Sequence, residues 1–438
     1  MFPGGIGDIY DVDSGRKPLK EWGKHLLRYF DGRFLKDQLF CLYAFNTIQR
    51  HTNNTQGNYF FTGDRFLGKQ PPTIEELKQQ IQEKNFSYCN KLRYFAQGIK
   101  GSDNWWRSRT QDLEAWINHH VSRGNGPPTF FITFSCAEYW WPDLRRILAE
   151  LEERAGDKSS SDAIRQGDMK AIRKATRKYT LFVNDFFMKR ARTFMNTVVK
   201  NALGIKHYWG RVEFAPGRGQ IHLHLLGIAD DRAYLDDFYK AKTMQAKAAV
   251  VDKYAREKLD MTADVNIDDR DKKRRPDPCT SVLRNRYSEC TNEVEDVRLL
   301  AQDCMCHHCN KYCLRDVKAN QPRKCRMHYG VESACGNENT PGLPRQDSSY
   351  IFTDDKGVRH FRMKRKHSVR VVQHSRTLLK GWRANCDIKL LLYFTNPQRP
   401  DINEIDEVCR YVVAYTAKKN HTSRHEKTIV QDLIEGYV

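Results

Sequence analysis

The sequence predicts an α+β fold in which helices precede an antiparallel sheet. Between residues 22 and 48, apolar residues recur at the spacing of amphipathic helices. Residues 129–135 are β-branched and aromatic, as in a buried strand. Residues 208–226 alternate between apolar and polar on both sides of a short Gly- and Pro-containing stretch. These observations predict a helical first part and a sheet-based second part.

A strong helix breaker separates the two parts. The run Gly124-Asn125-Gly126-Pro127-Pro128 disfavours any continuing helix. We therefore expect a helical region over residues 1–127 and a sheet-based domain over residues 128–438. A charged, cysteine-containing insertion at about 254–345 is expected to interrupt the second domain, because its residues are weakly patterned.

Four helices are expected in the first part. Two follow from the apolar spacing through Trp22–Phe30 and Leu39–Ile48, with a turn at Asp31–Phe34 between them. A third should begin at Thr73, because Thr73 and Glu76 form a capping-box pattern after two prolines. The fourth is predicted over Thr110–His120.

The second part should begin with a strand at 129–135 and continue with an amphipathic helix from Pro142 to about Glu153. Residues 156–168 are rich in Ser, Asp and Gly, so we expect an exposed loop there. A long basic helix is predicted from Met169 to about Asn201. The strands 208–214 and 220–226 should then form a hairpin.

Two elements are expected near the end. Tyr350–Phe361 has hairpin character, and a helix should begin near Asp401, where Asp401 and Glu404 form a second capping-box pattern after a proline. No internal repeat is apparent.

The charge balance indicates a polyanionic partner. Lys and Arg total 74 against 54 acidic residues, which gives a net charge of +20. Such a surplus suits nucleic acid, because each Lys or Arg that neutralises a phosphate releases condensed counterions. The alternative is a basic surface without a binding role. The sequence has no apolar run of bilayer length and no secretion-signal pattern, so we expect a soluble intracellular protein with no membrane partner.

A His-x-His pattern is the most informative feature of the predicted sheet. His222 and His224 lie two residues apart on a strand, so both side chains project from the same face. Two imidazoles in this arrangement can hold one divalent cation, and Glu213 on the preceding strand is the natural third ligand. The alternative is a chance pattern on an ordinary exposed strand.

Two tyrosines have the spacing of one helix face. Tyr411 and Tyr415 are four residues apart on the predicted C-terminal helix. A phenol can attack a phosphodiester and hold the cut strand covalently, and a nearby cation can assist it at neutral pH. The alternative is a pair of packing tyrosines.

Thirteen cysteines occur, six of them between Cys304 and Cys335, and this clustering favours metal ligation over disulfides. Cys306, Cys309, Cys313 and Cys325 have the ligand type and close spacing of a tetrahedral zinc site. The alternative is a set of reduced, unpaired cysteines.

Taken together, these motifs resemble Helitron-type rolling-circle transposases of the two-tyrosine HUH endonuclease class. Residues 211–226 resemble the acidic-aromatic strand, Gly-containing turn and His-hydrophobic-His strand of that family. Residues 128–142 resemble its first nuclease strand, Tyr411–Lys419 its two-tyrosine helix, and the segments around Phe2–Gly5 and Asp31–Phe34 its region before the nuclease. The resemblance runs in order along nearly the whole chain.

The resemblance implies a metal-dependent endonuclease that nicks and rejoins single-stranded DNA at transposon ends through a 5′-phosphotyrosine link. It implies catalytic roles for Tyr411 and Tyr415 and a Mg²⁺ or Mn²⁺ ion on His222, His224 and Glu213. A structural Zn²⁺ ion on His307, Cys309, Cys313 and Cys325 is also implied, with Cys306 or His308 as the alternative fourth ligand. DNA-binding roles for Lys418, Lys419 and Arg218 complete the implied site residues.

Three features depart from the family pattern. The stretch between Glu213 and His222 is one residue longer than expected, and the residues after Cys325 differ from the family's usual Phe and Pro. No phosphate-binding Gly-x-x-x-x-Gly-Lys-Ser/Thr loop occurs. A helicase partner, from a further domain or another protein, is therefore expected.

Basic and aromatic residues interleave at Trp105–Arg107, Arg173–Tyr179 and Phe361–Lys366, as in proteins that hold single strands. Solvated helix faces would give the same pattern. Residues 272–275 resemble a nuclear localisation signal, which predicts a nuclear protein. Two alternatives to the transposase remain: a plasmid- or virus-type replication initiator, and a non-catalytic relic that binds single strands.

Overall fold

The computed structural model describes residues 18–52 without 38, 42 and 50, parts of 73–83, and residues 103–214, 220–231, 234–266, 293–307, 314–315, 324–325, 348–353, 359–367 and 371–394. The chain divides into two compact units. The first consists of residues 1–114, 174–182 and 417–438, and the second of residues 115–173 and 183–416. No helix in the described part of the chain combines the length and apolar character that a membrane crossing requires.

The first unit contains the short helices α1 (Leu19–Leu27) and α2 (Arg33–Lys36), and residues between 39 and 52 are also helical. The predicted turn between the helices is present, with Gly32 at a φ of 67°. A small apolar core joins these helices through Leu26, Phe34, Phe40 and Ala44. Thr73 and Glu76 form the predicted reciprocal capping box, because each backbone N–H donates to the other's side chain.

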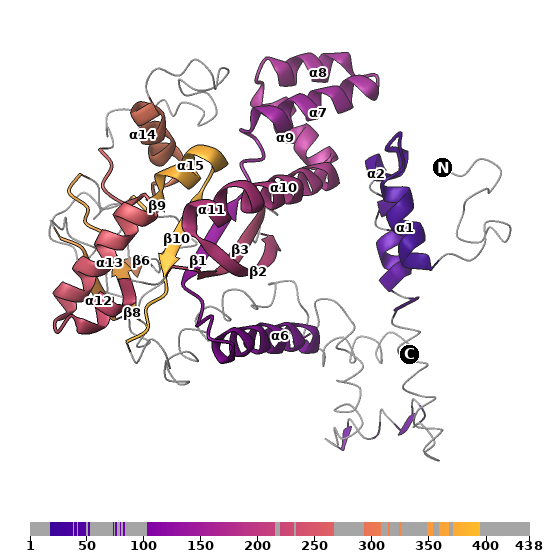
Figure 1. Ribbon diagram of the computed structural model, residues 1–438. Helices are drawn as coiled ribbons and strands as arrows, with labels where there is room; N and C mark the ends of the chain where they lie inside the picture. The colour runs from indigo at the N-terminus through magenta and orange to yellow at the C-terminus, as the bar shows by residue number, and fades with distance from the viewer. Residues whose placement is uncertain are drawn as a thin grey trace. The chain divides into compact units, whose positions relative to one another are not determined.

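The second unit is an α+β domain built on an antiparallel sheet, which confirms the predicted fold class (Figure 1). In the described residues its main sheet has the strand order β10-β1-β3-β2, and every pair is antiparallel. The main-sheet strands are β1 (Phe130–Ser135), β2 (Ile205–Phe214), β3 (Ile221–Ala229) and β10 (Cys386–Leu390).

The helices between β1 and β2 are α7 (Pro142–Arg154), α8 (Lys158–Arg165), α9 (Met169–Lys178), α10 (Thr180–Phe194) and α11 (Lys200–Leu203), with a π-helical turn, η2 (Met195–Val199), before α11; α6 (Asp103–Ser122) precedes β1. The elements after β3 are α12 (Tyr234–Lys240), α13 (Met244–Lys258), β4 (Met261–Thr262), α14 (Glu293–Cys304), β5 (Leu314–Arg315), β6 (Lys324–Cys325), β7 (Tyr350–Thr353), β8 (Arg359–Arg362), β9 (His374–Ser375) and α15 (Arg376–Trp382).

An aromatic core covers one face of the main sheet. Phe134 of β1 projects from this face and lies 5.1 Å from Trp382 of α15, measured between ring centroids. The Trp382 ring also packs against Phe187 and Phe194 of α10 and against Trp141. The Trp382 indole N–H donates to the backbone oxygen of Ser135, so its polar atom is satisfied. This face is therefore structural and leaves the opposite face of the sheet for other roles.

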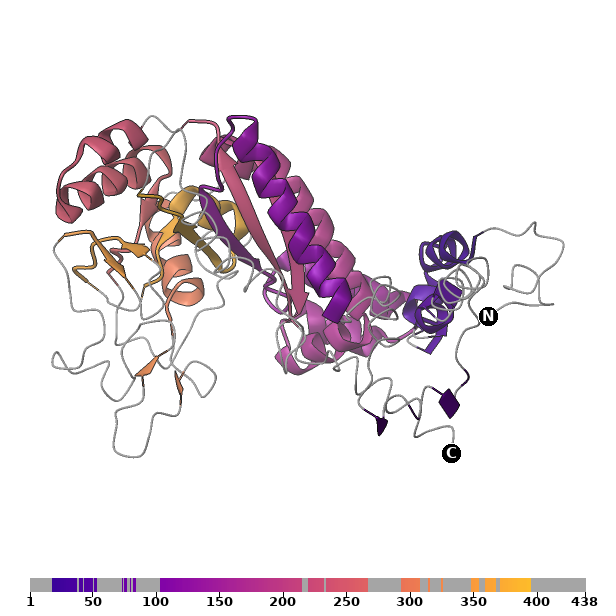
Figure 2. The same ribbon diagram turned by 90° about the horizontal axis from the view of Figure 1, so that it is seen from below.

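A second group of elements flanks the sheet (Figure 2). The α12–α13 pair lies beside the β7–β8 hairpin, which the sequence predicted at Tyr350–Phe361. The Ser349 hydroxyl connects the two: it donates to the Asp252 carboxylate of α13 and accepts the backbone N–H of Lys364. These bonds hold the segment that follows the predicted insertion against α13.

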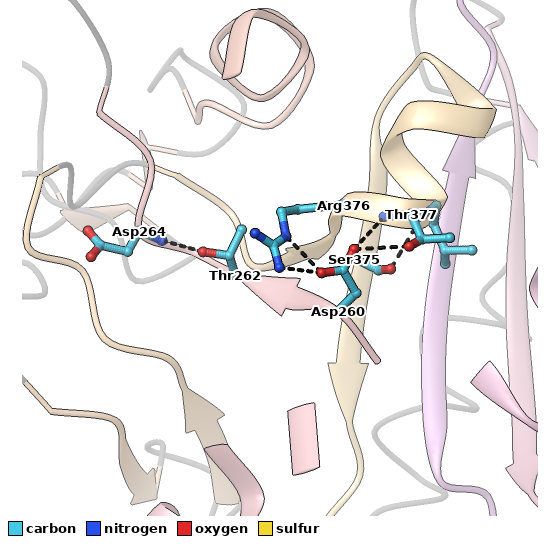
Figure 3. A network of polar contacts seen from close by, with 7 residues as sticks. Asp260, Thr262, Asp264, Ser375, Arg376 and Thr377 are labelled. Carbon is cyan, nitrogen blue, oxygen red and sulfur yellow. Dashed lines mark hydrogen bonds and ion pairs between the residues drawn. The ribbon is translucent and has the colours of Figure 1, made fainter. Parts of the chain in front are cut away.

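The N-terminus of α15 is capped twice (Figure 3). Ser375 is the N-cap residue, and its hydroxyl accepts the backbone N–H of Leu378. The Asp260 carboxylate accepts the N–H and hydroxyl of Thr377 and also binds the Arg376 guanidinium, with 2.8 Å from Nε to Oδ1. Asp260 adopts a φ of 51°, a left-handed conformation that Asp tolerates better than most residues. The cap thereby joins α15 to the segment before β4.

Two predictions for the segment before β2 need correction. The expected exposed loop at 156–168 contains α8, because Asp157 caps the backbone N–H of Ser160 and Ile164 packs into the core. The expected single basic helix is divided into α9, α10, η2 and α11. Within η2 the Thr197 hydroxyl donates to the backbone oxygen of Thr193, a bond that competes with regular helix geometry.

Candidate metal centre

The β2–β3 pair carries the predicted cation ligands on the face opposite the aromatic core. Glu213 pairs directly with His222 across the ladder, and Arg211 pairs with His224. Because paired residues of antiparallel strands share a face and alternate residues return to it, all four side chains project together. The β2–β3 pairing predicted from the sequence is therefore present, whereas the connecting residues 215–219 lie outside the described residues.

Glu213, His222 and His224 form a compact group. Their potential ligand atoms all lie within 4.8 Å of one another, and the described part of the chain holds no other group of three such side chains. The Glu213 Oε2 atom lies 3.1 Å from His224 Nε2 and 3.7 Å from His222 Nε2. The side chains are 10–17% exposed, so the group is shielded but still open to a ligand.

The Nδ1 atom of each imidazole has a hydrogen-bonding partner on the side of the ring away from Glu213. The His222 Nδ1 atom lies 3.4 Å from the backbone oxygen of Gln220, and the His224 Nδ1 atom lies 3.0 Å from the Thr133 hydroxyl. Phe131 stacks on His224 with a centroid separation of 5.5 Å. Both Nε2 atoms therefore point toward Glu213, which is the orientation that shared ligation requires.

The electrostatics of the group favour a cation. Burial raises the pKa of the Glu213 carboxyl, but its interactions with His222 and His224 outweigh burial and hold the pKa well below its usual range. Burial lowers the pKa of His224, against the opposing effect of Glu213. An ionised carboxylate and a neutral imidazole are the protonation states that bind a metal. Two nitrogens and one carboxylate oxygen fit a divalent ion such as Mn²⁺.

Three further residues lie on this face that the sequence pattern did not indicate. Arg211 is buried beside Glu213, Thr133 contacts His224, and Asp387 of β10 pairs with Thr133. Burial raises the pKa of Asp387, while Lys389, Arg362 and His224 lower it. Alternation along β2 could have identified Arg211, but only the pairing of β1 with β10 brings Asp387 to the site.

Most of the other predicted site residues lie outside the described residues. These are Tyr411, Tyr415, Lys418, Lys419, Arg218, Cys309, Cys313 and the alternative zinc ligand His308. The structure describes His307 and the alternative ligand Cys306, whose backbone forms an isolated bridge with Val371. Cys325 lies on β6 and pairs with Leu314, the residue that directly follows Cys313 in the sequence. The proposed zinc ligands therefore remain a prediction.

A comparison with protein families relates the chain to Helitron proteins. Residues 22–227 match the family described as the Helitron helicase-like domain at the N-terminus. The matched segment contains Glu213, His222 and His224, as well as Thr133. Searches of curated proteins and of solved structures found no match. The match supports a Helitron-related protein, in which the candidate metal centre lies near the end of the matched domain.

Proposed function

We propose that this protein is a metal-dependent single-strand DNA endonuclease and strand transferase that acts in rolling-circle transposition. The observation that carries the proposal is the Glu213–His222–His224 group, which lies within the Helitron-like segment. Two histidines and a carboxylate on one sheet face suit a Mg²⁺ or Mn²⁺ ion, with coordination positions left for a phosphate oxygen. When bound, the cation would polarise the scissile phosphate.

The nucleophile in this proposal is the phenol of Tyr411 or Tyr415. The phenol oxygen attacks the phosphorus atom and loses its proton, and the bond from phosphorus to the 3′ oxygen breaks. That oxygen leaves as a 3′-hydroxyl after it takes up a proton, and the 5′ phosphate stays on the tyrosine. Attack by another strand's 3′-hydroxyl reverses the step, so the chemistry needs no external energy source.

The partner in this proposal is single-stranded DNA at transposon ends. The charge of +20 supplies a general attraction for phosphates, and Arg211 is a cation beside the metal centre. The proposed setting is the nucleus, with a helicase supplied by a further domain or by another protein.

The deciding experiment incubates the protein with labelled single-stranded element ends and Mn²⁺, followed by denaturing electrophoresis. We expect a denaturant-resistant protein–DNA adduct, and mass spectrometry should locate the link on Tyr411 or Tyr415. Replacing both tyrosines with Phe keeps the rings and removes only the hydroxyls, so this variant should fold and form no adduct. An adduct on another residue would overturn the tyrosine assignment, whereas binding without cleavage would favour the non-catalytic relic.

We also propose one structural Zn²⁺ ion per chain on His307, Cys309, Cys313 and Cys325, with Cys306 or His308 as alternative ligands. Thiolates favour zinc over Mg²⁺, so a Mg²⁺ wash should leave it bound. Because metal binding and local folding are coupled, chelation should increase hydrogen exchange over residues 304–328. Metal analysis that finds no zinc in cleavage-competent protein would overturn this assignment.

A further inference from the structure

The geometry points to Thr133 as a positioning residue for His224, with the Asp387 carboxylate as the group that orients the Thr133 hydroxyl. This inference rests on the proposed cation site and adds two residues that do not touch the cation. The observations that carry it are the different partners of the two imidazoles and the row of residues across β3, β1 and β10.

The two histidines differ in what lies behind them. The partner of His222 is a backbone carbonyl, which can only accept a hydrogen bond. Ligation of a cation through Nε2 places the ring proton of His222 on Nδ1, where it can donate to this carbonyl. The carbonyl behind His222 therefore supports the tautomer that ligation requires.

His224 is arranged differently. Its Nε2 atom lies 3.1 Å from Glu213 Oε2, a hydrogen bond in which the ring N–H donates to the carboxylate. In this neutral ring Nδ1 carries no proton and accepts from the Thr133 hydroxyl, at 3.0 Å. Ligation through Nε2 requires the other neutral tautomer, with the proton on Nδ1. A hydroxyl serves both forms, because it donates to Nδ1 in one and accepts from it in the other.

When the Thr133 hydroxyl accepts from Nδ1, its own hydrogen needs another acceptor. Asp387 is the direct partner of Thr133 across the β1–β10 ladder, and His224 is its direct partner on the other side. The three side chains thus form a row on one face, with neighbouring Cβ atoms about 5 Å apart. In its ionised form the Asp387 carboxylate only accepts hydrogen bonds, so that form favours the hydroxyl orientation that the cation-bound His224 requires.

The test measures Mn²⁺ affinity on the full chain by the electron paramagnetic resonance of free Mn²⁺. The double variant His222→Ala and His224→Ala lacks both imidazoles, so the Mn²⁺ that it still binds measures binding at other sites. Thr133→Val removes the hydroxyl, keeps the β-branched shape, and should weaken Mn²⁺ binding about tenfold, the lower end of effects for outer partners of metal ligands. Thr133→Ser keeps the hydroxyl and should restore affinity to within about threefold of the wild type.

A matched control separates positioning from stability. The Thr129 hydroxyl accepts the backbone N–H of Ala229 at the far end of the same sheet. Thr129→Val should therefore lower the thermal unfolding midpoint but leave Mn²⁺ affinity unchanged. The role of Asp387 is tested by a double-mutant cycle. Asp387→Ala alone should weaken Mn²⁺ binding, and it should have no further effect in a chain that already carries Thr133→Val.

The outcomes distinguish the two proposals. Unchanged Mn²⁺ affinity in Thr133→Val, or equal weakening in Thr133→Ser, would overturn the role of Thr133 and leave the proposed function standing. Additive effects of Asp387→Ala and Thr133→Val would overturn the link between these residues. If the wild-type chain bound no Mn²⁺ that depends on His222 and His224, the cation site itself would fail, and this inference with it.

Discussion

At the residue scale, the proposed function assigns metal binding and DNA binding to different residues. Replacing His222 and His224 with Ala should abolish cleavage, because Glu213 alone cannot hold the cation. Affinity for single-stranded DNA should stay within a few-fold, since it derives mainly from basic residues elsewhere on the chain. Cleavage assays and filter binding on the same variant check this, and normal cleavage in Mn²⁺ would contradict the metal assignment.

The sequence predicted the candidate group of ligands but not its surroundings. His-x-His on a strand and an acidic residue on its neighbour depend only on local alternation and one hairpin, so the grouping of Glu213, His222 and His224 followed from spacing. Thr133 and Asp387 reach the site only through strand pairing between distant segments. Nothing in their own sequence neighbourhoods indicates that pairing.

At the scale of elements, β9 makes stability depend on pH. His374 of β9 is fully buried, and burial lowers its pKa to about 4. Above the unfolded pKa of about 6.5 the ring is neutral in both states. As the pH falls from there toward 4, the unfolded chain binds the proton first, so up to about 3 kcal/mol of the free energy of unfolding is lost.

Urea unfolding of the second unit, repeated at several pH values between 7.5 and 4.5, measures this loss in the free energy of unfolding. His374→Asn replaces the Nδ1 donor to the Val372 carbonyl with an amide and cannot titrate, so its stability should fall less steeply with pH. The comparison uses slopes, because the smaller side chain changes the absolute stability. Equal slopes in wild type and variant would contradict a buried neutral His374.

Local signals also explain which elements were predictable. The capping box at Thr73 and the apolar alternation of β3 are complete within a few residues, and both were predicted from the sequence. The helix α8 was missed because its Ser-rich sequence favours a loop, whereas packing against α7 buries Ser161 and Ile164. The predicted helix that begins near Asp401 lies outside the described residues.

At the scale of the whole molecule, the charge predicts how DNA binding responds to salt. If several phosphates are neutralised, the logarithm of the association constant should fall linearly with the logarithm of salt concentration, at about −0.7 per phosphate contact on single strands. Fluorescence anisotropy with a labelled oligonucleotide measures this slope over about 50 to 300 mM salt, a range that includes physiological ionic strength. An affinity independent of salt would point away from nucleic acid as the partner.

The position of β10 has a consequence for fragments of this protein. β1 lies between β3 and β10, and its partner strand comes from Cys386–Leu390, far along the chain. A fragment cut at residue 227, where the Helitron-like match ends, would keep Glu213, His222 and His224 but expose one edge of β1. That edge, Phe-Phe-Ile-Thr-Phe-Ser, is largely apolar and carries no charge, a composition that promotes edge-to-edge aggregation. Such a fragment would also lose Trp382, which covers the aromatic core, so its insolubility would reflect this lost protection of the sheet rather than a defective candidate metal centre.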